Sequence, residues 1–95
     1  MIKLNIIEAE GSEKIYELSS DTIIGRDPSC GIVIADPAIS RTHAKITVSE
    51  DACWVEDLES KAGTFVNGQR VDVRVELLEG DLLRVGPAAV TVHFN

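Results

Sequence analysis

Three chemically capable side chains, Ser40, Arg41 and His43, lie close together in the stretch DPAISRTHAKI, which runs from Asp36 to Ile46. A serine beside a histidine is part of many nucleophilic catalytic sites, and a histidine is also a common metal ligand. A serine beside an arginine, in contrast, is suited to binding an anion. The rest of the sequence has to decide among a catalytic group, a metal site and an anion-binding site.

A catalytic role would use Ser40 as the nucleophile, His43 as the base and Asp57 as the group that orients the histidine. Nucleophilic serines of acyl-transfer enzymes usually sit on a glycine-flanked turn such as GxSxG. The chain has no such turn, and its 95 residues leave little room for a substrate cleft. We therefore expect that the protein is not an enzyme.

A zinc site would have to combine Cys30, Cys53, His43 and His93, which are dispersed and form no CxxC-like cluster. Two cysteines are also too few for a disulfide-dependent scaffold, so we expect reduced thiols in a cytoplasmic protein. The sequence thus predicts no metal ion and no cofactor.

Phosphate binding fits the residues better. A phosphate dianion favours a guanidinium fork, hydroxyl donors and backbone N–H groups. Arg26 follows a glycine, Ser40 and Arg41 precede an alternating apolar run, and Lys61 lies further along the chain. If their loops converge, one phosphate would meet up to three cations and a hydroxyl. Charge-assisted hydrogen bonds of about 1.5–3 kcal/mol each would give a modest, reversible interaction with a peptide.

The composition excludes other classes of ligand. The net charge of −7 argues against sequence-independent binding to nucleic acid or to an anionic membrane, which requires a basic face. No apolar run approaches the roughly 20 residues that span a bilayer. The first ten residues, MIKLNIIEAE, alternate in polarity and contain an early acid, unlike a signal peptide. Hydrophobic residues make up 44% of the chain, so we expect one globular domain over residues 1–95.

The elements that must position these residues are strands, because apolar and polar residues alternate with a period of two along most of the chain. The alternation predicts eleven strands, over residues 2–8, 14–19, 22–25, 32–34, 43–49, 52–57, 64–66, 69–71, 75–77, 82–85 and 88–94. The best helical candidate, Val71 to Leu78, is β-branched and interrupted, so we reject it. Short strands with regular turns predict an all-β sandwich or barrel, with binding residues on loops at one end.

Four motifs in the chain resemble, in order, those of the forkhead-associated (FHA) domain family. These are Gly25-Arg26, then Ser40-Arg41-Thr42-His43, then Asp57-Leu58-Glu59-Ser60-Lys61-Ala62-Gly63-Thr64, and finally Asn67-Gly68. The motifs span the middle half of the chain. The resemblance implies an eleven-strand β-sandwich of the FHA type that binds phosphothreonine peptides through loops at one end.

The resemblance also implies roles for single residues. Arg26, Ser40 and Arg41 would bind the phosphopeptide, together with Lys61 and Thr64. Gly25, His43, Ser60, Gly63, Asn67 and Gly68 would be structural, with His43 bridging two loops and Asn67-Gly68 making a tight turn. Thr64 would also help to shape its loop.

Ala62 departs from the family pattern, which usually has an asparagine at this position. That asparagine would hydrogen-bond the backbone of the bound peptide, whereas alanine offers no polar atom. We therefore expect a weaker hold on the peptide, by about 1–3 kcal/mol, with the phosphate grip intact. Lys61 beside it would compensate by reaching the phosphate, or is an ordinary solvated lysine.

The leading hypothesis is a module that binds a threonine-phosphorylated protein and docks a signalling partner after a Ser/Thr kinase has acted. The alternative is a phosphorylation-independent scaffold that holds another protein, and Ala62 keeps this alternative open.

Overall fold

The computed structural model describes residues 2–50 and 52–94, which form an all-β fold. Its eleven strands are β1 (Ile2–Ile7), β2 (Glu13–Leu18), β3 (Thr22–Gly25), β4 (Ile32–Val33), β5 (Ala44–Val48), β6 (Cys53–Asp57), β7 (Thr64–Val66), β8 (Gln69–Arg70), β9 (Val75–Leu77), β10 (Leu82–Val85) and β11 (Ala88–Phe94). The predicted strands are all present, with bounds within one residue of those expected, and no helix occurs in the described ranges. The all-β prediction is confirmed.

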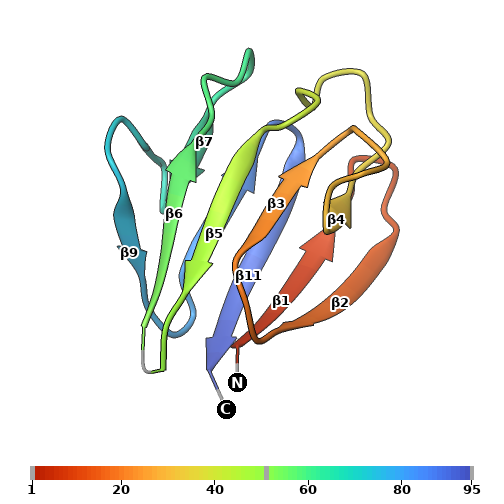
Figure 1. Ribbon diagram of the computed structural model, residues 1–95. Helices are drawn as coiled ribbons and strands as arrows, with labels where there is room; N and C mark the ends of the chain where they lie inside the picture. Colours follow the sequence, from red (N-terminus) through yellow and green to blue (C-terminus); the bar gives the residue numbers. More distant parts are fainter. Residues whose placement is uncertain (1, 51, 95) are drawn as a thin grey trace.

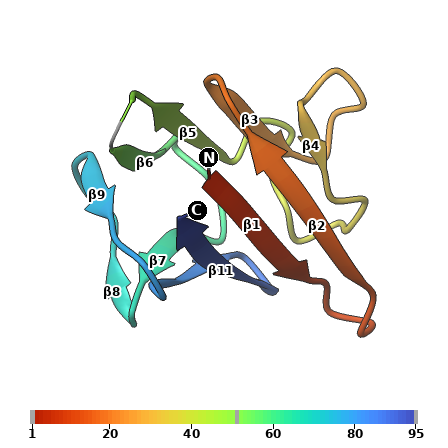
Figure 2. The same ribbon diagram turned by 90° about the horizontal axis from the view of Figure 1, so that it is seen from below.

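The strands form two sheets that pack face to face as a sandwich (Figures 1 and 2). The larger sheet has six strands in the order β2-β1-β11-β10-β7-β8, and the smaller has five in the order β4-β3-β5-β6-β9. Neighbouring strands in both sheets are antiparallel except β3 and β4, which are parallel. The alternation in the sequence allowed either a sandwich or a barrel, and the structure is a sandwich.

The core lies between the sheets because the alternating apolar residues face inward. Leu4 and Val92 are directly opposite each other on β1 and β11, and both are fully buried. On the smaller sheet, Ile46 and Val55 make the equivalent pair on β5 and β6. Burying a side chain of this size stabilises the fold by about 1.5–3 kcal/mol. The strands are therefore committed to the core, and binding chemistry is left to the loops.

The loops that carry the motif residues gather at one end of the sandwich, and the start of β1 and the end of β11 lie at the other end (Figure 1). These are the β3–β4 loop (residues 26–31), the β4–β5 loop (34–43) and the β6–β7 loop (58–63). Ile34 and Ile39, at 2% and 1% exposure, anchor the long β4–β5 loop in the core. The loop end is thus built on the same apolar core as the strands.

Two further features bear on the expectations from the sequence. Cys30 and Cys53 are free thiols, while the cytoplasmic location inferred from the cysteine content stays a prediction. Within residues 2–50 and 52–94, no helix is long and apolar enough to cross a bilayer.

Candidate functional site

A groove of about 690 Å³ opens where the three loops meet. It contains four of the five residues predicted to bind a phosphopeptide. The residues that line it are Arg26, Pro37, Ala38, Ile39, Ser40, Arg41, Thr42, Leu58, Glu59, Lys61 and Ala62. Residues that are up to 36 positions apart in the chain thereby share one surface.

Arg26 begins the β3–β4 loop and is tied to the β4–β5 loop by two hydrogen bonds. Its backbone N–H donates to the carbonyl oxygen of Ser40 at 3.0 Å, and its Nε donates to the carbonyl oxygen of Ile39 at 3.0 Å. Because Ile39 is buried, this carbonyl is a fixed point. The Nε of the guanidinium is thereby held in the groove. Its two terminal amino groups have no hydrogen-bond acceptor within residues 2–50 and 52–94. They are available to an anion.

Gly25, directly before Arg26, allows the two loops to approach this closely. A Cβ atom on Gly25 would lie 2.0 Å from the carbonyl oxygen of Arg41. This oxygen belongs to the backbone, so a change of side-chain rotamer could not remove the clash. The same carbonyl oxygen accepts hydrogen bonds from the backbone N–H of Asp27 and from the thiol of Cys30. Only glycine fits at this position.

Ser40 connects the β4–β5 loop to the β6–β7 loop. Its Oγ accepts a hydrogen bond from the backbone N–H of Lys61 at 3.0 Å. A hydroxyl that accepts in this way keeps its own proton free to donate. Ser40 is half-buried and lines the groove, so the geometry leaves that proton for a ligand oxygen.

His43 lies fully buried beneath the groove and links the same two loops. Its Nδ1 accepts the backbone N–H of Ser40 at 3.1 Å, and its Nε2 lies 2.9 Å from the carbonyl oxygen of Gly63. Because Nδ1 is an acceptor here, Nε2 must carry the proton and donate to that carbonyl. The hydrogen bonds thus assign a neutral imidazole that spans two loops and does not line the groove.

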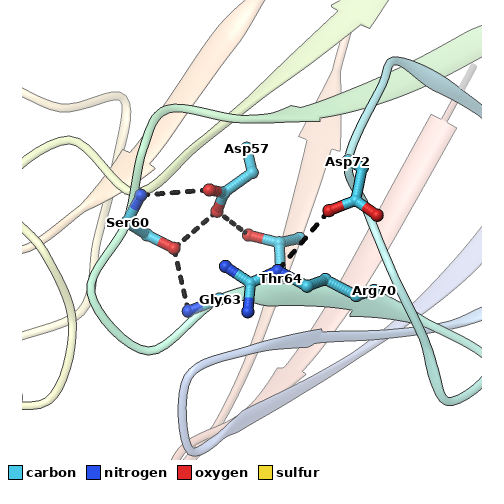
Figure 3. A network of polar contacts seen from close by, with 6 residues as sticks. All are labelled: Asp57, Ser60, Gly63, Thr64, Arg70 and Asp72. Carbon is cyan, nitrogen blue, oxygen red and sulfur yellow. Dashed lines mark hydrogen bonds and ion pairs between the residues drawn. The ribbon is translucent and has the colours of Figure 1, made fainter.

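Asp57, at the end of β6, holds the β6–β7 loop in place through hydrogen bonds to Ser60 and Thr64 (Figure 3). Its Oδ1 accepts the hydroxyl of Ser60 at 2.5 Å and the hydroxyl of Thr64 at 2.6 Å, and its Oδ2 accepts the backbone N–H of Ser60 at 3.0 Å. The hydroxyl oxygen of Ser60 in turn accepts the backbone N–H of Gly63 at 3.0 Å. One carboxylate therefore fixes both ends of the loop.

The pKa of Asp57 lies below its ordinary value of 3.8. Desolvation by burial favours the neutral acid and raises the pKa, but the hydrogen bonds from Ser60 and Thr64 together outweigh it. The carboxylate is thus held in its ionised form, the state that accepts all of these bonds.

The remaining cations of the groove, Arg41 and Lys61, are exposed. The pKa of Asp27 is lowered first by the backbone N–H and hydroxyl of Ser29, and then by the nearby charges of Arg41 and Arg26. The charges of these two arginines therefore both act on the same carboxylate, that of Asp27. The positive charge of the groove is local, since the chain as a whole carries a net charge of −7.

Seven of the eleven predicted site residues do not line the groove, namely Gly25, His43, Ser60, Gly63, Thr64, Asn67 and Gly68. Thr64 is fully buried and donates its hydroxyl proton to Asp57. Asn67 and Gly68 form the turn between β7 and β8, with φ angles of 49° and 85°, and do not line the groove. The side chain of Asn67 instead contacts Asp81 and Leu82.

Sequence reasoning missed two features of the site. It did not identify the carbonyl oxygen of Ile39 as a partner of Arg26, because a backbone acceptor leaves no signature in residue types. It also assigned no bracing role to Asp57, although an aspartate three residues before a serine is a common pattern for side chain to backbone hydrogen bonds in turns. Over residues 2–50 and 52–94, no group of three or more candidate ligands could hold a metal ion.

Comparisons with known proteins agree with the motifs. The family model for the FHA domain matches residues 22–86. The FHA domain-containing protein PS1 of Arabidopsis thaliana is 38% identical over 74 residues, which cover 74% of this chain and 5% of that protein. This protein and two other curated relatives are much longer than the present chain, and the matched regions span 5% to 16% of their lengths.

Solved structures give the same result for the fold. The crystal structure of the FHA domain of the CT664 protein from Chlamydia trachomatis superposes with a TM-score of 0.91 at 28% identity, covering 99% of this chain and 97% of that one. A structure described as a structural and functional analysis of phosphothreonine-dependent FHA domain interactions superposes with a TM-score of 0.85 at 26% identity, covering 99% and 96% of the two chains.

Proposed function

Because the chain belongs to the FHA domain family, we propose that it is a non-catalytic module that binds threonine-phosphorylated segments of a partner protein. One observation carries the proposal. Three loops bring Arg26, Ser40 and Arg41 together with Lys61 around one open groove, with the hydroxyl proton of Ser40 uncommitted.

The chemistry of these residues suits a phosphate dianion. The free terminal amino groups of Arg26 can approach two phosphate oxygens as a fork, and Ser40 can donate its hydroxyl to one of them. Arg41 and Lys61 add positive charge that partly neutralises the phosphate. Because both are exposed, no unpaired cation is buried in the free protein. Such a site binds reversibly, because each contact contributes only a few kcal/mol and the groove stays open to water.

A preference for threonine over serine follows from the apolar part of the groove. Ala38 and Ala62, both exposed, line it alongside the cations and offer apolar surface to the γ-methyl group of a phosphothreonine. Transfer of one methyl group contributes only about 0.8 kcal/mol, so a stronger preference requires that the methyl also orients the phosphate. The structural neighbour described by phosphothreonine-dependent interactions supports this choice of residue.

A second candidate function is a phosphorylation-independent scaffold, and Ala62 is the observation that favours it. Ala62 lines the groove and is exposed, at the position where the family usually presents an asparagine amide to the peptide backbone. With that contact absent, the phosphate must supply more of the binding energy, or the loop end has lost its peptide function.

We also propose that residues 1–95 form a single domain of this family and that a Ser/Thr kinase generates its ligand. The first part is supported by strands that lie outside the matched region, since β1, β2 and β11 pair with one another in the larger sheet. The second part follows from the chemistry of the ligand.

The test is calorimetric titration with peptide pairs that differ only in phosphorylation of one threonine. We expect measurable binding of the phosphorylated peptides and at least about 100-fold weaker binding of the unphosphorylated ones, equivalent to about 2.7 kcal/mol. A matched phosphoserine peptide should bind less tightly than its phosphothreonine counterpart. Equal binding with and without phosphate would contradict the proposal and favour the scaffold.

A further inference from the structure

Glu59 is the one acidic residue among those that line the groove. It follows Leu58 in the β6–β7 loop, is exposed, and has a φ angle of 55°. This left-handed conformation is uncommon for residues other than glycine, and asparagine and aspartate tolerate it best. The other such residue in the described ranges is Asn67, a type suited to its hairpin turn. Glutamate is not the residue that local backbone geometry favours here.

The carboxylate of Glu59 is also not used inside the protein. Other carboxylates of the loop end accept internal hydrogen bonds: Asp27 from Ser29, Asp36 from the backbone of Ala38, and Asp57 from Ser60 and Thr64. No ion pair or hydrogen bond engages the side chain of Glu59 within residues 2–50 and 52–94. An unfavourable backbone conformation that carries an uncommitted charge into a binding groove calls for a functional explanation.

A negative charge beside a phosphate site acts on the residues next to the phosphate. It repels the phosphate itself and acidic neighbours, and it attracts a cation. Glu59 is two positions from Lys61 in the chain. Because Glu59 lines the same groove as Arg26 and Ser40, the residues that flank a phosphothreonine bound there come close to its carboxylate.

We propose that Glu59 makes this groove select phosphothreonine peptides that carry a lysine or arginine close to the phosphate, and reject peptides with an acid there. The inference rests on the proposed function. It also accounts for Ala62, because a charge pair between Glu59 and a basic peptide residue supplies ordering that the missing amide does not. The net charge of −7 favours the same ligands, since a basic peptide is attracted to the molecule as a whole.

A positional scan tests the inference. One phosphothreonine peptide is made in versions with lysine, alanine or glutamate at each of the three positions on either side of the phosphothreonine. Affinities are measured for the unsubstituted protein and for the variants Glu59→Gln and Glu59→Asn. Asparagine suits the left-handed backbone, so the second variant removes the charge while keeping the loop conformation. The control is Glu76→Gln, the same charge change at an exposed position on edge strand β9.

In the unsubstituted protein we expect lysine, at one or two of these positions, to bind roughly two- to fivefold tighter than alanine, and glutamate to bind weaker by a similar factor. The difference should disappear in both Glu59 variants, persist in Glu76→Gln and shrink as salt is raised. Both Glu59 variants should bind the phosphothreonine peptide with alanine at the scanned positions at least as well as the unsubstituted protein does.

Two outcomes would overturn the inference while leaving the proposed function in place. One is phosphate-dependent binding with no preference for basic neighbours, and the other is a preference that survives in both Glu59 variants. If no peptide of the scan binds better when phosphorylated, the proposed function fails and the inference fails with it.

Discussion

The loop end has two layers that differ in burial although their residues alternate in the sequence. The lower layer consists of His43, Ser60 and Thr64, which are 0%, 8% and 0% exposed. The upper layer is the rim formed by Arg26, Arg41 and Lys61, all exposed. His43 is separated from Arg41 by one residue, and Lys61 directly follows Ser60. Neighbouring residues of one motif therefore differ in role, since one is buried in the loop end and the next is exposed at the groove.

The two layers differ in how their polar groups are satisfied. Every side chain of the lower layer has an internal partner, through Asp57, Ser40 or Gly63. A buried polar group that loses its partner costs about 1–3 kcal/mol, so changes here should act on stability. The rim keeps charged groups exposed, so changes there should act on binding. Ser40 joins the layers, with its backbone N–H on His43 and its hydroxyl at the groove.

The largest effect should come from Arg26→Ala. This change removes the guanidinium fork, and we expect at least about 100-fold loss of affinity for a phosphothreonine peptide, or about 2.7 kcal/mol. The melting temperature should stay close to that of the unsubstituted protein, because Arg26 is exposed. Calorimetry and thermal denaturation measure the two effects. Arg84→Ala, an exposed arginine of β10, is the control and should bind normally. Unchanged affinity in a folded Arg26→Ala protein would remove Arg26 from the site.

His43→Ala should show the reverse pattern. It leaves the backbone N–H of Ser40 and the carbonyl of Gly63 without partners, and we expect a loss of about 2 kcal/mol in the free energy of unfolding. For a domain of this size the melting temperature should fall by about 10 °C. His93→Ala, which breaks only an exposed contact with Glu79, is the control. Equal stability of the two variants would show that the lower layer does not brace the loops.

Acidification should act on the lower layer through Asp57. Its pKa is lower in the folded protein than the ordinary value of 3.8, so the unfolded chain takes up a proton first as the pH falls. The stabilisation is therefore complete above about pH 5 and is lost as the pH drops through the folded-state pKa. Denaturant unfolding between pH 6 and pH 3 measures the decline, to which Asp27 and Glu79 contribute in the same direction. The decline should be shallower in Asp57→Asn. An identical pH dependence in that variant would contradict the bracing role of the carboxylate.

The smallest effect should come from Ala62→Asn, which adds a polar group to the rim. Restoring one hydrogen bond to the peptide backbone should tighten phosphothreonine-peptide binding by about 0.5–1.5 kcal/mol, mainly through a slower dissociation rate. Surface plasmon resonance with paired peptides gives both rates. The gain should be absent with unphosphorylated peptides, because the phosphate brings the backbone to this loop. No gain with several phosphothreonine peptides would mean that Lys61 already compensates or that the peptide binds in another manner.

The strands were predictable from the sequence because alternation reports directly which residues face the core. Ile2, Leu4 and Ile6 alternate with Lys3 and Asn5, and the structure buries the first three on one face of β1. The turn at Asn67-Gly68 was predictable for a similar reason, since this dipeptide tolerates the two positive φ angles that a two-residue hairpin requires.

The arrangement of the site was predictable only in part. The motif spacing, read through the family resemblance, identified Arg26, Ser40 and Arg41, but residue types alone do not tell which side of a loop is buried. Thr64 was predicted both to bind the peptide and to shape its loop, and the structure buries it at the start of β7, off the groove lining. The left-handed backbone of Glu59 could not be foreseen either, because glutamate is not a residue type that favours this conformation.

The most direct test of the account is a map of backbone amide chemical shifts during titration with a phosphothreonine peptide and with its unphosphorylated form. The account predicts that only the phosphorylated peptide shifts the amides of the three loops, above all those of Arg26, Ser40, Arg41 and Lys61, while the outer faces of both sheets stay unchanged. Shifts that are the same for both peptides, or that lie on a sheet face and leave the loops unaffected, would contradict it.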